Sequence, residues 1–169
     1  MLDSTRAWAQ FTMPPPAEPV DALPPSAHPL PPHTEPVPAA AECTIMTNDI
    51  YLRSYRSGQS NDVGDSMGMT MICTQDVRVL VRASPSPESA DFQYRLLRQE
   101  SGGATLRYQL YTDYGRSQIW GNGEGQSVPI NRSVSAGSTT LDVFATIFAH
   151  QSVPPGRYSD TVIVTIDVE

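Results

Sequence analysis

The chain has 169 residues, with 18 acidic and 11 basic side chains, a net charge of −7 and a pI of about 4.8. This acidic balance argues against a nucleic-acid partner, because phosphate binding needs a basic face. Apart from three histidines, every basic side chain is arginine, so Schiff-base chemistry and a P-loop lysine are both excluded.

The N-terminal part, residues 1–40, is predicted to be an extension that precedes the folded domain. Residues 14–38 hold 11 of the 16 prolines, and each proline fixes its own φ and lacks an amide donor. We expect a polyproline-like or disordered spacer here. An SH3-type ligand is the alternative, but the basic residue that such ligands usually carry is missing. No stretch approaches about 20 apolar residues, so no membrane span is predicted.

The triplet Ala7-Trp8-Ala9 has the small-x-small form of a signal-peptide cleavage site. The residues before it are too few and too polar to form the apolar region of a signal peptide. The triplet is therefore either the remnant of a signal whose true start lies upstream, which implies export, or a chance match.

From residue 41 onward, strand-sized runs alternate with turn residues, which predicts an all-β domain over residues 41–169. In Val77–Ala83, three valines (Val77, Val79 and Val81) share one face while Arg78 and Arg82 lie on the other, as in a sheet with one wet face. Thr139–Ala149 is apolar on both faces and is expected in the middle of a sheet. The predicted strands are Cys43–Leu52, Met67–Cys73, Val77–Ala83, Phe92–Arg98, Thr105–Thr112, Gln126–Asn131, Thr139–Ala149 and Tyr158–Val168. Their number and spacing indicate an immunoglobulin-like β-sandwich.

Two cysteines, Cys43 and Cys73, lie 30 residues apart. Two free thiols in a cytosolic protein are one interpretation. The favoured one is a disulfide, because one cysteine opens the domain and the other ends a predicted strand. A disulfide indicates an oxidising compartment.

No catalytic, metal or cofactor site is predicted. Two of the three histidines lie in the proline-rich stretch and the third stands alone, whereas metal sites and catalytic triads need partners. Four carboxylates might be taken for a glycosidase pair, but acidic residues at turns usually accept local hydrogen bonds. They are Asp113, Glu124, Asp142 and Asp160.

Trp120, with Tyr111 and Tyr114, is a candidate stacking platform for a sugar. The favoured interpretation is structural: these aromatic rings cover one end of the core. The neighbouring glycines, Gly121, Gly123 and Gly125, would then supply the positive φ that the turn requires.

Several motifs in this order resemble the spore coat protein U domain, which is also found in subunits of Csu-type (archaic) chaperone–usher pili. The resemblance covers about residues 41–169. The motifs are the opening Cys43, the strand Met69–Cys73, Asp113 after a tyrosine-rich strand, Trp120-Gly121-Asn122-Gly123, and Gly156-Arg157-Tyr158-Ser159-Asp160 before the last strand.

This resemblance implies a sandwich that lacks its final strand and is completed by donor-strand complementation. A periplasmic chaperone would lend a strand first, and a neighbouring subunit would replace it at the outer-membrane usher. An open sheet edge with exposed apolar surface favours such an exchange. The residues expected to line the acceptor groove are Val162, Val164, Ile166 and Val168.

The donor strand of such subunits normally lies just before the first cysteine, but here Thr34–Glu42 contains two prolines, which cannot donate to a ladder. The candidate is therefore the segment 7–13, with Ala9, Phe11 and Met13 on one face. The alternatives are a subunit that accepts without donating, or a secreted coat protein that does not polymerise. The acidic end of the chain, residues 167–169, also departs from the apolar ending typical of these subunits.

The sequence thus predicts a non-catalytic, exported structural subunit of a surface pilus or coat. Its partners would be a periplasmic chaperone, an outer-membrane usher and neighbouring subunits. The alternative is an adhesin-like binding module of the same fold, using the Trp120 loop and stable as a monomer.

Overall fold

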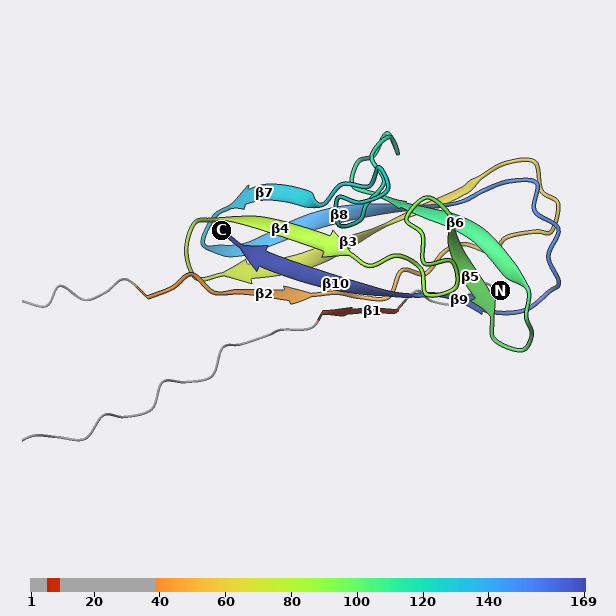
Figure 1. Ribbon diagram of the computed structural model, residues 1–169, viewed down its shortest axis with the longest axis horizontal. Coiled ribbons are helices and arrows are strands. Elements are labelled where there is room, and N and C mark those ends of the chain that lie inside the picture. Colours follow the sequence, from red (N-terminus) through yellow and green to blue (C-terminus); the bar gives the residue numbers. More distant parts are fainter. Residues whose placement is uncertain (1–5, 10–38) are drawn as a thin grey trace, which may run out of the picture. The chain divides into compact units, whose positions relative to one another are not determined.

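The computed structural model describes residues 6–9 and 39–169, which form two β-sheets packed face to face (Figure 1). This part of the chain contains no helix, and so none that is long and apolar enough to cross a membrane. The strands are β1 (Arg6–Ala9), β2 (Cys43–Met46), β3 (Val63–Cys73), β4 (Val77–Ala83), β5 (Arg95–Gln99), β6 (Thr105–Tyr111), β7 (Ile130–Val134), β8 (Gly137–Ile147), β9 (Tyr158–Ser159) and β10 (Thr161–Val168). The predicted all-β, immunoglobulin-like sandwich is confirmed.

The two sheets have different sizes. The smaller has the order β1-β10-β4-β7 and the larger the order β2-β3-β8-β6-β5-β9. Among the described strands, every pairing between neighbours is antiparallel except that of β1 with β10, which is parallel. As expected, the long apolar strand β8 is central, with β3 on one side and β6 on the other.

The core lies between the sheets and is built by alternation of side chains along each strand. In β4, Val79 and Val81 are fully buried, while Arg78 and Arg82, on either side of this pair, lie on the opposite, outward face. The methionines of β3 behave in the same way, since Met69 and Met71 are fully buried. Because successive side chains point to opposite faces, every second residue of these strands enters the core.

Two predicted strands are shorter in the structure. The first ends at Met46, because Thr47, Asn48 and Asp49 favour a turn. The last is broken at Asp160. There the chain crosses from the larger sheet, where β9 pairs with β5, to the smaller sheet, where β10 pairs with β4.

Four other strands are shifted or extended, and one of these, β8, runs over Gly137–Ile147 rather than the predicted Thr139–Ala149. β3 begins at Val63 because it pairs with β8 over eleven residues. β5 begins only at Arg95, since Gln93 N–H donates to the Asp91 carboxylate in a local turn. The short strand predicted at residues 126–131 lies at Ile130–Val134. Gln126 has a φ of 64° and Ser127 closes a turn onto the Glu124 carbonyl, so no strand begins there.

The predicted proline-rich spacer, residues 14–38, lies outside the described residues, as do Phe11 and Met13 of the candidate donor segment.

Candidate functional site

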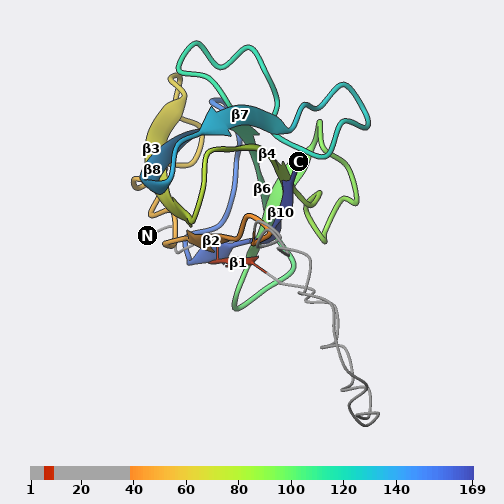
Figure 2. The same cartoon turned by 90° about the vertical axis from the view of Figure 1, so that its left-hand side faces the viewer.

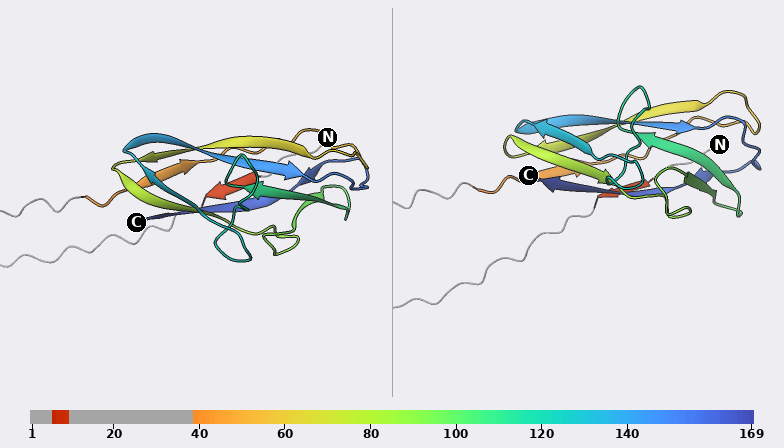
Figure 3. Two further views of the ribbon diagram at one scale, coloured as in Figure 1. Left: turned by 90° about the horizontal axis from the view of Figure 1, so that it is seen from above. Right: turned by 45° about the horizontal axis from the view of Figure 1, so that its top comes forward.

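The C-terminal strand β10 has different neighbours along its two halves. Its first half, from Thr161 to Val164, pairs with β1, and its second half, from Val164 to Val168, pairs with β4. Beside the first half, on the β4 side, Ser84 continues the contact through its amide and hydroxyl, which bond the Ile163 backbone. Figure 3 shows β1 lying against β10 in both views.

The inward side chains of β10 become more exposed toward the C-terminus. Val162 and Val164 are 1% and 0% exposed, Ile166 is partly buried, and Val168 is 40% exposed. These are the four residues expected to line an acceptor groove, and the structure places them on one face of one strand. In the described part of the chain, the edge of β10 beyond Val164 has no strand on the side where β1 lies.

The edge of the larger sheet that lies on the same side of the sandwich is β2. Figures 1 and 2 both show β2 next to β1 and β10. β2 is four residues long and pairs with β3, and no second strand in the described part of the chain adjoins it. Met46 of β2 and Ile72 of β3 leave 52% and 45% of their surfaces exposed nearby. One side of the sandwich is therefore bounded by two strands, from different sheets, that each offer backbone groups to a further strand.

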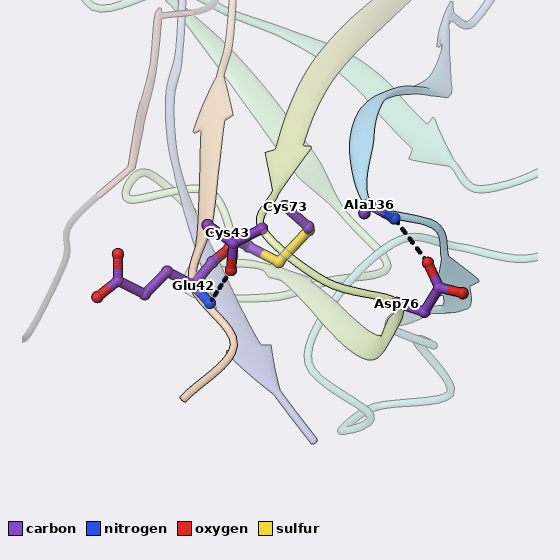
Figure 4. Close-up of a disulfide and its surroundings, with 6 residues drawn as sticks. Glu42, Cys43, Cys73, Asp76 and Ala136 are labelled. Atoms are coloured by element: carbon purple, nitrogen blue, oxygen red, sulfur yellow. Dashed lines mark hydrogen bonds between the residues drawn. A yellow bond between two sulfur atoms is a disulfide. The ribbon is translucent and has the colours of Figure 1, made fainter. Parts of the chain in front are cut away.

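A disulfide joins Cys43 to Cys73, as predicted, with an S–S distance of 2.07 Å (Figure 4). The two cysteines lie opposite each other in the β2–β3 register. Beyond the bond, the Thr74 amide donates to the Glu42 carbonyl at 2.9 Å, and the Glu42 amide donates to the Thr74 hydroxyl at 3.0 Å. A strand of four residues has few backbone bonds, so this covalent link holds β2 in place.

A buried polar cluster fixes the start of β10. The Tyr108 hydroxyl donates to the Asp160 carboxylate at 2.5 Å, and the Thr161 amide donates to the other carboxylate oxygen at 2.8 Å. Burial raises the pKa of Asp160 above its ordinary value, although the hydrogen bonds from Tyr108, Ser86 and Thr161 oppose this shift. Burial also raises the pKa of the Tyr108 hydroxyl well above its ordinary value. Asp160 therefore ties the point where the chain changes sheets to the centre of β6.

Sequence reasoning missed Arg95, which is fully buried. Its Nη2 donates to the Trp120 carbonyl at 3.1 Å, and its guanidinium lies 5.7 Å from the centre of the Phe92 ring. The signal was available in the sequence: Arg95 shares a strand face with Leu97, so an arginine stands at an inward position of an apolar alternation.

Trp120 is part of the core, as the favoured structural interpretation predicts, and it does not form a sugar-stacking platform. The side chain is 1% exposed, and its indole N–H donates to the Val81 carbonyl at 3.1 Å. Tyr114, by contrast, is 85% exposed and meets the edge of Phe144. A buried indole cannot present a face to a ligand, so the structural interpretation holds for this residue.

The glycines of the two motifs occupy crowded or unusual positions. The predicted positive φ is found at Gly123 (+103°) and Gly125 (+55°), but the prediction is wrong for Gly121. Gly121 is required instead by close packing, because a Cβ there would lie 2.2 Å from the Ser127 hydroxyl. A Cβ on Gly156 would lie 2.7 Å from the Gln99 amide nitrogen. These positions need glycine for packing and backbone conformation.

The remaining motif residues close local loops. The Asp113 carboxylate accepts hydrogen bonds from the Ser117 amide and hydroxyl and from the Gln118 amide. The Gln118 amide makes the largest contribution to holding the pKa of Asp113 below its ordinary value. Tyr158 is buried, and its hydroxyl donates to the Pro154 carbonyl at 2.7 Å.

The candidate carboxylates do not form a metal centre in the described part of the chain. No group of three or more His, Cys, Asp or Glu side chains there could hold a metal ion. Asp113 and Asp160 each serve a local hydrogen-bond network, as described above.

Together, the two-sheet sandwich, the β2–β3 disulfide and the late sheet change define a disulfide-bonded, immunoglobulin-like β-sandwich protein. Residues 36–165 match the family model described as the Spore Coat Protein U domain. The chain belongs to this family, and the predicted family is confirmed.

Two individual proteins illustrate the relationship. Over 73 residues the chain is 36% identical to "Protein U" of Myxococcus xanthus, a stretch that covers 43% of this chain and 39% of that protein. The fold is also similar to a chain in the crystal structure of the CsuC–CsuE complex. That complex is the chaperone–tip adhesion subunit pre-assembly complex of the archaic chaperone–usher Csu pili of Acinetobacter baumannii. The TM-score is 0.55 at 17% identity, over 76% of this chain and 40% of that chain. This chain therefore spans about two fifths of the length of each protein.

Proposed function

We propose that this chain is a structural subunit of a surface pilus or coat, joined to its neighbours by addition of a β-strand at the β10 edge. The observation that carries the proposal is the second half of β10. Its inward apolar residues become exposed where the described part of the chain provides no further strand on that side. A strand added there would pair the free backbone groups and cover Ile166 and Val168.

The family and the fold support this proposal. The matched family is that of a spore coat protein, and the similar solved chain comes from a complex of a chaperone with a pilus subunit. By analogy, a periplasmic chaperone would complement the β10 edge first, and an outer-membrane usher would then mediate replacement by a neighbouring subunit. Such a chain is exported through the periplasm to the cell surface. The oxidised Cys43–Cys73 pair fits this route, because disulfides persist in the periplasm and outside the cell.

In this function the four inward residues of β10 act as the acceptor surface, and the motif residues hold the sandwich that presents it. We assign no catalytic or cofactor-binding residue. The Asp113–Ser117 loop and the Trp120 contacts then serve folding rather than chemistry.

The proposal is tested by co-expressing the chain with a candidate periplasmic chaperone and measuring how much complex is recovered. Val168→Asp places a charge on the inward face of the open half of β10 and is expected to reduce recovery at least tenfold. Thr165→Asp is the matched control, because Thr165 lies on the outward, exposed face of the same strand, and it is expected to leave recovery unchanged.

A monomer that is stable alone, and that binds neither the chaperone nor an added strand, would refute the proposal. That result would favour a self-contained binding module of the same fold.

A further inference from the structure

The edge that we assign to a neighbouring subunit is partly occupied by the chain's own N-terminal strand. β1 runs parallel to β10, with Arg6 opposite Thr161 and Ala9 opposite Val164. By its contacts, β1 belongs to the same compact unit as residues 41–169. The element that fills the first half of the edge is thus part of the segment that the sequence marks as a candidate donor.

From these observations we infer that β1 is a provisional plug, which closes the acceptor edge within one molecule and must leave before another strand can take its place. This inference rests on the proposed function, because it names the first occupant of the same edge. The occupant is this chain's own residues 6–9.

The pairing is of a kind that can be displaced. It consists of four residue pairs, whereas β10 offers eight residues, from Thr161 to Val168. A parallel ladder is also slightly less stable per residue than an antiparallel one. An incoming antiparallel strand that spans all of β10 would therefore form more backbone bonds, and better ones, than those it replaces.

The tether explains why so short a strand can pair at all. Residues 10–42 join β1 to β2, so the pairing of β1 with β10 is an intramolecular event that does not depend on protein concentration. The same segment is rich in proline and, if extended at about 3.1 Å per residue, reaches roughly 100 Å. That is far enough to deliver the strand to another molecule.

Pairing within one molecule and donation to the next are therefore two uses of one segment. They are related in the way that a closed monomer is related to a domain-swapped assembly. At low protein concentration, the tethered β1 occupies the β10 edge. A longer donor, or a crowded assembly site, shifts the balance toward exchange.

The register is tested by cross-linking the full chain. Trp8 lies opposite Ile163 in the β1–β10 register, so Trp8→Cys with Ile163→Cys is expected to form an intramolecular disulfide at a rate independent of protein concentration. The control pair, Trp8→Cys with Thr165→Cys, is offset by two residues and is expected to cross-link at least tenfold more slowly. Equal rates for both pairs, or cross-links only between molecules, would overturn the inference.

Competition is tested with a synthetic peptide of residues 3–13 as the added strand. Ala7→Pro with Ala9→Pro removes two amide donors from β1. The change is expected to strengthen peptide binding about tenfold if the plug keeps nine molecules in ten closed. Leu2→Pro with Ser4→Pro, which precedes β1, is the matched control and is expected to leave peptide affinity unchanged.

The two proposals fail differently. If the peptide and a candidate chaperone bind every variant with equal affinity and the register cross-link is absent, the plug is refuted and strand addition stands. If no variant binds either partner, strand addition itself is refuted.

Discussion

The loop between β6 and β7 and the outer edge of β10 are opposite in character. In the loop, Trp120 is buried and hydrogen-bonded, Asp113 accepts three local hydrogen bonds, and Gly121 leaves no room for a side chain. At the β10 edge the residues are ordinary valines and an isoleucine, and their burial declines along the strand. The comparison shows that distinctive residues fix this fold, whereas the proposed function lies in a plain strand whose backbone is incompletely paired.

The largest expected effect on stability comes from a substitution in the loop between β6 and β7. Trp120→Ala should lower the free energy of unfolding by about 3–5 kcal/mol, because it empties a core position and leaves the Val81 carbonyl without its donor. Tyr114→Ala is the control: this side chain is 85% exposed, so the change should stay within about 0.5 kcal/mol. Denaturant melts of the two variants check this, and equal losses would contradict the assignment of Trp120 to the core.

The next effect concerns the strand that faces the β10 edge. Replacing both Cys43 and Cys73 by alanine should lower stability by roughly 3–4 kcal/mol on the chain-entropy model. Hydrogen exchange should show the earliest loss of protection at β2, since its four residues pair with β3 alone among the described strands. Uniform loss across both sheets would argue that β2 does not depend on the bond.

A third prediction compares the two halves of β10. Val164→Ala should cost about 1–2 kcal/mol, because it removes two buried methyl groups. Val168→Ala should cost less than about 0.5 kcal/mol in the isolated chain, where this residue is 40% exposed. When the melts are repeated in the chaperone complex, the stability losses of Val164→Ala and Val168→Ala should become more similar. An unchanged difference between these two losses would mean that Val168 remains uncovered in the complex.

The smallest effects come from two carboxylates with opposite pKa shifts. Burial raises the pKa of Asp160 above the ordinary 3.8, so its stabilising contribution is full below pH 3.8 and is lost as the pH rises through the raised value. Hydrogen bonds lower the pKa of Asp113, so its contribution is present above pH 3.8 and is lost as the pH falls through the lowered value.

Urea unfolding midpoints measured across the acidic pH range should distinguish the contributions of Asp160 and Asp113 to stability. As the pH rises, the stability of Asp160→Asn should increase relative to that of the parent protein. Over the same pH range, the stability of Asp113→Asn should decrease relative to that of the parent protein. Parallel curves for the two variants would show that neither carboxylate titrates differently on folding.

Much of this molecule could be predicted from its residues. The alternation of side chains predicted both ends of β4 correctly. The apolar run of β8 predicted the central strand, and the two cysteines predicted the disulfide. The break at Asp160 could not be predicted, because it depends on two sheets competing for consecutive residues. Arg95 was missed because burial of a charge depends on partners that are distant in sequence, such as the Trp120 carbonyl. The parallel partner of β10 was also beyond reach, since the pairing direction of a tethered strand is not encoded in its pattern.

The position of the disulfide has a mechanical consequence. A pull on the chain ahead of Cys43 meets the covalent link at once, and the load passes through sulfur to Cys73, at the end of the longest ladder, β3 with β8. Residues 44–72 form a loop shielded from the load, so β2 cannot be peeled from β3 one bond after another.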